Sequence, residues 1–196
     1  MFRTIIFLCS LTLLFSCDSN SEYVKSIQDF RIMKDESFKK GENSPLPKKE
    51  KMAFTGLQYF EVDPSYKVAA TFKEQSLPQY INLYGEQDVK QVHQVKGTLT
   101  FDIQGKQHAL LAYSTIGQAQ HTLFVPFLDK TNGKSTYAGG KYVEAIKQKD
   151  GSYSIDFNLS YQPFCVYNEN YKCAICPREN FVNGEVLAGE KLSTLH

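Results

Sequence analysis

Short apolar stretches separated by turn residues dominate the chain from about residue 58 onward. They are rich in Val, Ile, Phe and Tyr, which is the pattern of β-strands. The expected strands are 58–61, 66–72, 89–103, 107–114, 122–128, 141–148 and 152–159. No long helical run follows residue 40 and no βαβ alternation occurs, so the pattern predicts a mostly β fold, a single antiparallel barrel or sandwich-like domain.

Two of these strand pairs are joined by tight turns. Gln104-Gly105-Lys106 separates one pair, and Asp150-Gly151 separates another. Both pairs are predicted to be β-hairpins, the second through a type I′ turn, because Asp-Gly readily adopts the left-handed conformations that this turn requires.

A helical period precedes the strands. Val24, Ile27, Phe30 and Met33 recur at near-helical spacing, with charged and amide residues between them. This spacing predicts a short amphipathic helix from Tyr23 to about Lys40. Two prolines and a glycine in 41–47 end the pattern, and the basic run 48–51 is interpreted as a solvated loop.

Residues 1–16 have the composition of a signal peptide. Arg3 is their only charge, and the apolar run of about a dozen residues is well short of the roughly 20 needed to span a bilayer. The segment ends Leu14-Phe15-Ser16-Cys17, which resembles the lipobox of bacterial lipoproteins. The alternative is an ordinary cleaved signal whose cysteine is incidental.

The lipobox resemblance implies cleavage before Cys17 and acylation of its thiol. Two or three acyl chains anchor a protein durably, whereas one does so only marginally. Residues 17–22 would then be a polar tether and 23–196 a single domain in the cell envelope, attached to a membrane through lipid and facing the periplasm or the exterior.

The expected domain is almost neutral. Removing residues 1–16 takes away one of 22 basic residues and leaves 21 against 21 acidic residues. Without a basic field we expect no nucleic-acid partner. About 180 residues suffice for one buried core, and 14 Phe with 12 Tyr suit strands that have one buried and one wet face.

Three cysteines remain in this domain: Cys165, Cys173 and Cys176. Export would place them in a compartment that permits disulfides, but three thiols cannot all pair within one chain. Cys165 could form a structural bridge with Cys173 or Cys176, whereas a pair of Cys173 with Cys176 would be a redox-type CxxC. The residues alone leave these alternatives open.

Polar side chains alternate with apolar ones in the last expected strand. Asp156, Asn158 and Ser160 would share one face there, because successive side chains of a strand point to opposite sides. Such a row could line a ligand pocket, or it could be the solvent side of the strand.

Several stretches resemble the bacterial DUF1684 family, whose function is not established. They include Phe54-Thr55-Gly56-Leu57-Gln58-Tyr59-Phe60, Thr136-Tyr137-Ala138-Gly139-Gly140-Lys141-Tyr142 and the block 161–180, and the resemblance runs from about residue 30 to 191. The family pattern lacks a cysteine at Cys176, so the resemblance implies a Cys165 to Cys173 pair. The matching polar positions include Asp129, Thr131, Gly133, Tyr137, Asp156, Asn158, Tyr161, Tyr167, Glu179, Asn180 and Glu190.

Three functional hypotheses follow. The first is an envelope binding or structural module with a pocket lined by Asp156, Asn158, Tyr161, Glu179 and Asn180. The second is a hydrolase-type enzyme with Asp156 and Glu179 as a carboxylate pair, assisted by Tyr161 or Tyr137. The third is a thiol-redox protein that uses Cys173 and Cys176.

No metal or cofactor is expected. The histidines show no paired spacing, and they are His93, His108, His121 and His196. The chain has no P-loop, dinucleotide fingerprint, HExxH or GxSxG motif.

Overall fold

The computed structural model describes residues 15–84, 90–114 and 121–192. Its helices are α1 (Phe15–Lys40) and α2 (Lys48–Ala53). Its strands are β1 (Lys67–Tyr84), β2 (Lys90–Ile103), β3 (Lys106–Ser114), β4 (Thr122–Phe127), β5 (Lys141–Lys147) and β6 (Tyr153–Asp156). Of the one-turn 3-10 helices, Pro64–Tyr66 precedes β1, and Phe157–Leu159 and Phe164–Val166 follow β6.

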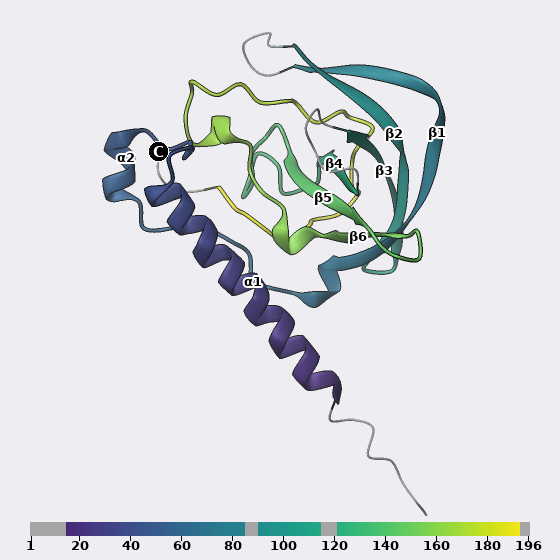
Figure 1. Cartoon of the computed structure of the whole chain (residues 1–196), viewed down its shortest axis with the longest axis horizontal. Helices are drawn as coiled ribbons and strands as arrows, with labels where there is room; N and C mark the ends of the chain where they lie inside the picture. The colour runs from purple at the N-terminus through teal and green to yellow at the C-terminus, as the bar shows by residue number, and fades with distance from the viewer. Residues whose placement is uncertain (1–14, 85–89, 115–120, 193–196) are drawn as a thin grey trace, which may run out of the picture.

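The strands form one closed antiparallel barrel in the order β1-β2-β3-β4-β5-β6 (Figure 1). Each strand pairs with its neighbour in sequence, and β1 closes the barrel by pairing Lys67 to Ala70 with Asp156 to Tyr153. The predicted mostly β antiparallel fold with a short N-terminal helix is therefore confirmed, and of the two predicted architectures, barrel and sandwich, the structure is the barrel.

The interior of the barrel is filled by alternate side chains of all six strands. Leu99, Leu110, Val125, Val143 and Ile155 are at most 1% exposed and belong to one continuous cluster. Side chains that alternate with them point outward, so β5 and β6 present Glu144, Ile146, Ser154 and Asp156 on the outer surface. This outer surface of β5 and β6 carries the site described below.

The first two strands continue beyond the rest of the barrel. β1 pairs with β6 only as far as Ala70, whereas its pairing with β2 extends to Tyr84 opposite Lys90. The resulting ribbon curves over the barrel, on the side opposite the N-terminal end of α1 (Figure 1). The strand predicted from the sequence ended at residue 72, whereas β1 continues past it, and its pairing with β2 shifts in register between Glu74 and Gln79.

Both predicted hairpins form, but their turns differ from expectation. Gln104 and Gly105 have φ values of 50° and 72°, and they alone separate β2 from β3, which is the geometry of a type I′ turn. At Asp150-Gly151 only Gly151 has a positive φ, 88°. The type I′ prediction is wrong there, because the loop has three residues: Gly151 donates to the Gln148 carbonyl, and Gln148 donates to the Ser152 carbonyl.

Three other predicted segments also differ. Residues 58–61 form only a single bridge between Tyr59 and Glu190, because neighbouring backbone groups bond to side chains such as Asp35, which accepts from the Leu57 amide. Residues 48–51 belong to α2 rather than a loop. The last strand stops at Asp156, whose carboxylate caps the next 3-10 helix by accepting from the Asn158 amide. Asp156, Asn158 and Ser160 therefore do not form a row along one strand.

Helix α1 is longer than predicted. It begins at Phe15, so residues 17–22, expected to be a polar tether, are helical. Residues 1–14 of the predicted signal peptide and the side chain of Cys17, the predicted lipidation site, lie outside the described part of the structure. Among the described helices, none combines the length and apolar character needed to cross a membrane.

The C-terminal segment 161–181 covers the outer face of β3 to β5. Ala174 and Cys176 pack there against Tyr113, Phe124 and Tyr142, and the Tyr142 hydroxyl donates to the Ala174 carbonyl. A disulfide joins Cys165 to Cys173, whose Cα atoms are 5.8 Å apart. This is the pairing implied by the family resemblance.

Candidate functional site

Two of the predicted pocket residues hold the N-terminal half of α1. The Tyr23 hydroxyl lies 2.9 Å from both carboxylate oxygens of Asp156, and the Asn158 side-chain amide donates to the same hydroxyl at 2.9 Å. Asn158 also donates to the Asp63 carbonyl and accepts from the Asp63 amide. The Asn158 side-chain amide uses its donors and its acceptor in these hydrogen bonds and so fixes the loop before β1. Of Asp156 and Asn158, only Asp156 remains partly exposed.

A second contact holds the C-terminal half of α1. Glu190 is 1% exposed and forms a salt bridge with Lys34 of α1. Its carboxylate also accepts from the Gln162 amide at 2.8 Å and from the Tyr167 hydroxyl at 2.9 Å. Burial and the Glu190 carboxylate both raise the pKa of Tyr167, which keeps its hydroxyl protonated as a donor.

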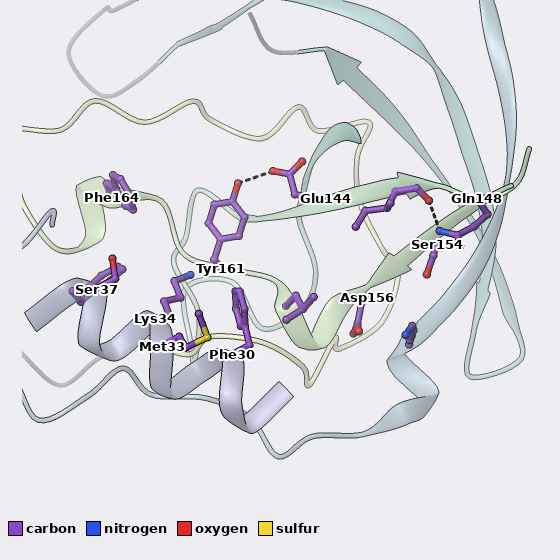
Figure 2. A pocket seen from close by; sticks show the side chains of 14 residues that line it. Phe30, Met33, Lys34, Ser37, Glu144, Gln148, Ser154, Asp156, Tyr161 and Phe164 are labelled. Atoms are coloured by element: carbon purple, nitrogen blue, oxygen red, sulfur yellow. Dashed lines mark hydrogen bonds between the residues drawn. The ribbon is translucent and has the colours of Figure 1, made fainter. Parts of the chain in front are cut away.

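Tyr161 lies between α1 and β5. Its ring faces the Lys34 ammonium at 4.9 Å, and its hydroxyl donates to Glu144 of β5 at 3.1 Å (Figure 2). Burial first, and then the Glu144 charge, raise the pKa of Tyr161 well above its ordinary value. Tyr161 is therefore a protonated donor to Glu144 across the pH range in which proteins are folded.

The remaining predicted pocket residues lie elsewhere. Asn180 is buried, where its amide donates to the carbonyls of Leu111 and Pro126 and accepts from the Leu111 amide. It joins β3 to β4, which among the described residues pair directly through Tyr113 and Phe124. Glu179 is exposed, and its charge contributes to raising the pKa of Tyr113, after burial. The structure thus brings Asp156, Asn158 and Tyr161 to α1, whereas Asn180 is buried against β3 and β4 and Glu179, which precedes it in the chain, is exposed.

A groove runs beside α1, between this helix and the outer surface of β5 and β6 (Figure 2). We call it the α1 groove, and its volume is about 870 Å³. Half of its fourteen lining residues are apolar or aromatic, and the polar half includes two lysines and two carboxylates. The lining residues are Phe30, Met33, Lys34, Ser37, Phe38, Lys67, Glu144, Ile146, Gln148, Ser154, Asp156, Leu159, Tyr161 and Phe164.

Several apolar side chains of this groove face solvent. Phe30 is 43% exposed, Met33 71%, Ile146 50% and Phe164 41%. Figure 2 shows Phe30 and Met33 pointing from α1 toward the groove, with Tyr161 above them in this view. Clustered exposed apolar side chains on a soluble surface are typical of binding sites.

The sequence contained a signal for this groove that its interpretation missed. Val24, Ile27, Phe30 and Met33 are spaced by three, and because each step falls about 60° short of a full turn, they rotate around the helix. Only Ile27 of these four is buried, together with Phe38. Phe30 and Met33 could thus have been assigned to an outer face. No comparable pattern marked Glu144 and Ile146. The alternation of apolar and polar residues on a strand shows which side chains point outward, but not which part of the outer surface another element lies against.

A second group of polar family positions is closed to solvent. Lys141 and Asp129 form an ion pair at 3.3 Å, and both side chains are 0% exposed. The Lys141 ammonium also donates to the Val186 carbonyl at 2.9 Å, and Asp129 accepts from the Thr131 amide at 2.6 Å. Burial lowers the pKa of Lys141, whereas Asp129 opposes this change. A ligand cannot reach this pair without opening the fold.

The cysteines do not form a redox-type CxxC in this structure. Cys173 is bonded to Cys165, and Cys176 is a buried free thiol. Burial raises the pKa of Cys176, which disfavours the thiolate needed for exchange. A Cβ added to Gly140, whose φ is +100°, would lie 2.3 Å from the Cys176 sulfur, so this close packing requires glycine.

No group of three or more potential metal ligands occurs among the residues that the structure describes. Of the histidines in this part of the chain, His93 is buried and stacks on Phe124, with ring centroids 5.6 Å apart. His196 lies outside the described residues.

Fold and groove together define a closed six-stranded antiparallel barrel with a docked N-terminal helix and an apolar groove beside it. The chain belongs to the family described as protein of unknown function (DUF1684), whose model matches residues 52–191. The match begins after α1, so the groove combines strands of the family domain with a helix that precedes it.

A solved structure supports the same fold. The chain is 35% identical to an uncharacterised protein of Haloarcula marismortui with a solution NMR structure, at a TM-score of 0.70 over 91% of this chain and 99% of that chain. No curated protein matches the chain.

Proposed function

We propose that the protein is an exported lipoprotein, anchored at Cys17, whose domain is a cell-envelope binding module with the α1 groove as its ligand site. The α1 groove is the observation that carries the proposal. Its volume of about 870 Å³ lies within the range of roughly 300–1,000 Å³ found for small-molecule pockets. Its lining, which combines seven apolar or aromatic residues with seven polar ones, favours an amphiphilic ligand.

The course of α1 supports a link between anchor and groove. Cys17 and Phe30, the first groove residue, belong to the same helix and are thirteen residues apart. At a rise of 1.5 Å per residue this separation is about 20 Å. An acylated Cys17 would therefore hold the groove close enough to a bilayer to exchange amphiphiles with it.

The enzymatic alternatives receive less support. Asp156 lines the α1 groove, but Glu179 does not, so these two carboxylates do not face one cavity. The carboxylate that accompanies Asp156 in the groove is Glu144, and Tyr137 is not among the lining residues either. Thiol exchange is disfavoured by the Cys165 to Cys173 bond and by the burial of Cys176.

Photolabelling would test the groove. The acylated full-length product, purified into phosphatidylcholine nanodiscs, is labelled with an uncharged dodecyl amphiphile that carries a diazirine. Ile146→Glu places a charge in the groove, and Leu77→Glu is the matched control on the β1 ribbon, where Leu77 is 74% exposed. We expect Ile146→Glu to reduce labelling at least tenfold and Leu77→Glu to leave it unchanged. Equal labelling of all three proteins would contradict the proposal.

Metabolic labelling would test the anchor separately. Cells that express the protein are fed an alkyne analogue of palmitate, and incorporation is compared between the natural chain and Cys17→Ala. We expect the label in the natural chain only. Incorporation that persists in Cys17→Ala would show that Cys17 is not the acylated residue.

A further inference from the structure

Negative side chains of the α1 groove outnumber its positive side chains once the charges that are already paired are left out. Four charged side chains line the groove: Lys34, Lys67, Glu144 and Asp156. Lys34 is already paired with the buried carboxylate of Glu190, which lies behind the groove. Because Lys34 is paired with Glu190, the lining retains one other lysine, Lys67, and two carboxylates, Glu144 and Asp156, so the carboxylates outnumber the remaining ammonium group.

The two groove carboxylates are held in place by neutral hydroxyl donors. Tyr161 donates to Glu144 at 3.1 Å, and Tyr23 lies 2.9 Å from both oxygens of Asp156. Hydrogen bonds to a carboxylate favour its ionised form without cancelling its charge. These hydrogen bonds therefore fix the positions of the Glu144 and Asp156 carboxylates beside the groove.

Aromatic rings accompany these carboxylates. Phe30, Phe164 and Tyr161 all line the groove, and Lys34 already lies 4.9 Å from the centroid of Tyr161, which shows that this wall accepts an ammonium group. Lys67 makes a similar contact with Tyr23, at 4.9 Å, at the edge of the groove. The negative face of an aromatic ring attracts organic cations, most strongly those that are weakly hydrated.

We infer that the ligand of the α1 groove is a small cationic amphiphile: an apolar chain with an alkylated ammonium head. The chain lies along Phe30, Met33 and Ile146, and the head lies on the side of Glu144 and Asp156. This inference rests on the proposed function and adds the charge of the ligand to it. Fatty acids and uncharged amphiphiles have the same apolar chain but lack the charge that these carboxylates favour.

A matched series of probes would test the charge. Three dodecyl diazirine probes carry a trimethylammonium head, a dimethylamine oxide head without net charge, or a carboxylate. Each is titrated below its micellar concentration against the acylated protein in phosphatidylcholine nanodiscs, and labelling of peptides from residues 30–37 and 144–164 is quantified. We expect half-maximal labelling by trimethylammonium at a concentration about tenfold lower than for either other probe.

Two conservative variants and a control separate the groove from the membrane. Glu144→Gln and Asp156→Asn keep hydrogen-bond acceptors for Tyr161 and Tyr23, and each is expected to reduce the preference for trimethylammonium by at least threefold. Glu185→Gln alters an exposed carboxylate outside the groove and should leave the preference unchanged. This control removes any effect of unequal probe partitioning into the bilayer.

The outcomes distinguish the inference from the proposed function. Equal labelling of the groove by all three probes, or stronger labelling by the carboxylate, would overturn the cationic ligand while leaving a groove for amphiphiles. A trimethylammonium preference that survives in both variants would overturn the assigned role of Glu144 and Asp156. No groove labelling by any probe would overturn the proposed function itself.

Discussion

Two groups of buried or half-buried charges occupy different parts of this barrel and differ in their access to solvent. Asp129 and Lys141 form an ion pair in which both side chains are 0% exposed, whereas Asp156 and Lys34 border an open groove. Both groups contain positions that match the DUF1684 pattern. Family resemblance therefore marks residues that build the fold as well as residues near a possible ligand, and only the structure separates them.

Access to solvent also changes what each group can contribute. A closed ion pair contributes through the penalty of breaking it, because its charges cannot be hydrated once the partner is lost. A carboxylate beside an open groove contributes little to stability, but it can interact with a ligand. Substitution of the closed pair should consequently cost more stability than substitution of a residue beside the groove.

The largest expected loss of stability is at the closed pair. Lys141→Met removes the ammonium and leaves Asp129 as a buried, unpaired carboxylate, which should lower the free energy of unfolding by about 3–5 kcal/mol. Urea denaturation followed by circular dichroism measures this change. Lys147→Met, at an exposed position of the same strand, is the matched control and should stay within about 0.5 kcal/mol of the natural chain. A comparable small loss in both variants would show that the ion pair is not a central stabilising contact.

A smaller loss is expected at the α1 contact. Tyr23→Phe removes the hydroxyl that Asp156 and Asn158 share, which should cost about 1 kcal/mol. The loss should appear first as faster amide exchange in residues 20–28, because the Lys34 to Glu190 contact still holds the rest of α1. Tyr171→Phe, at an exposed tyrosine, should change neither quantity. Unchanged exchange in Tyr23→Phe would mean that the hydroxyl does not hold the helix.

The smallest effect is a dependence of stability on pH. Burial lowers the pKa of His93, so the unfolded chain takes up a proton at a higher pH than the folded chain does. Stability should fall as the pH drops through the ordinary histidine pKa of about 6.5, and it should level off below the lowered pKa of the folded state. His108, whose pKa is also lowered chiefly by burial, adds to the same trend.

Thermal unfolding between pH 5 and pH 8 would measure this dependence. His93→Phe keeps an aromatic ring beside Phe124 and should reduce the slope, whereas His121→Phe at an exposed site should not. An unchanged slope in His93→Phe would assign the pH dependence to other groups.

Much of the fold could be predicted from the sequence because it depends on local patterns. Five of the six strands were anticipated near their observed positions, and Gly105 and Gly151 marked both hairpin turns. The predicted strand boundaries were wrong where a side chain forms hydrogen bonds with backbone groups in place of a neighbouring strand. Asp156 ends β6 by capping a 3-10 helix, and this event leaves no mark in the alternation of apolar and polar residues.

The site was less predictable because it depends on contacts distant in sequence. Tyr23 and Asp156 are 133 positions apart in the sequence. Lys34 and Glu190 form a salt bridge although almost the whole sequence of the domain separates them. The polar family positions suggested one pocket, but Asn158 and Asn180 bind backbone groups instead. Phe30 and Met33 form an apolar wall with Ile146. This wall could not be predicted from the sequence, because the position of α1 on the barrel is not known from it.

A peptide map of photolabelled sites is the most direct test of the α1 groove as the ligand site. The acylated protein in nanodiscs is labelled with the dodecyl trimethylammonium diazirine, digested and analysed by mass spectrometry. We predict adducts on α1 around Met33 and on the facing segments around Ile146 and Phe164, all lost in Ile146→Glu. Adducts confined to the β1 ribbon around Leu77 and Tyr80, unaffected by Ile146→Glu, would contradict the assignment and move the ligand site to the opposite side of the barrel.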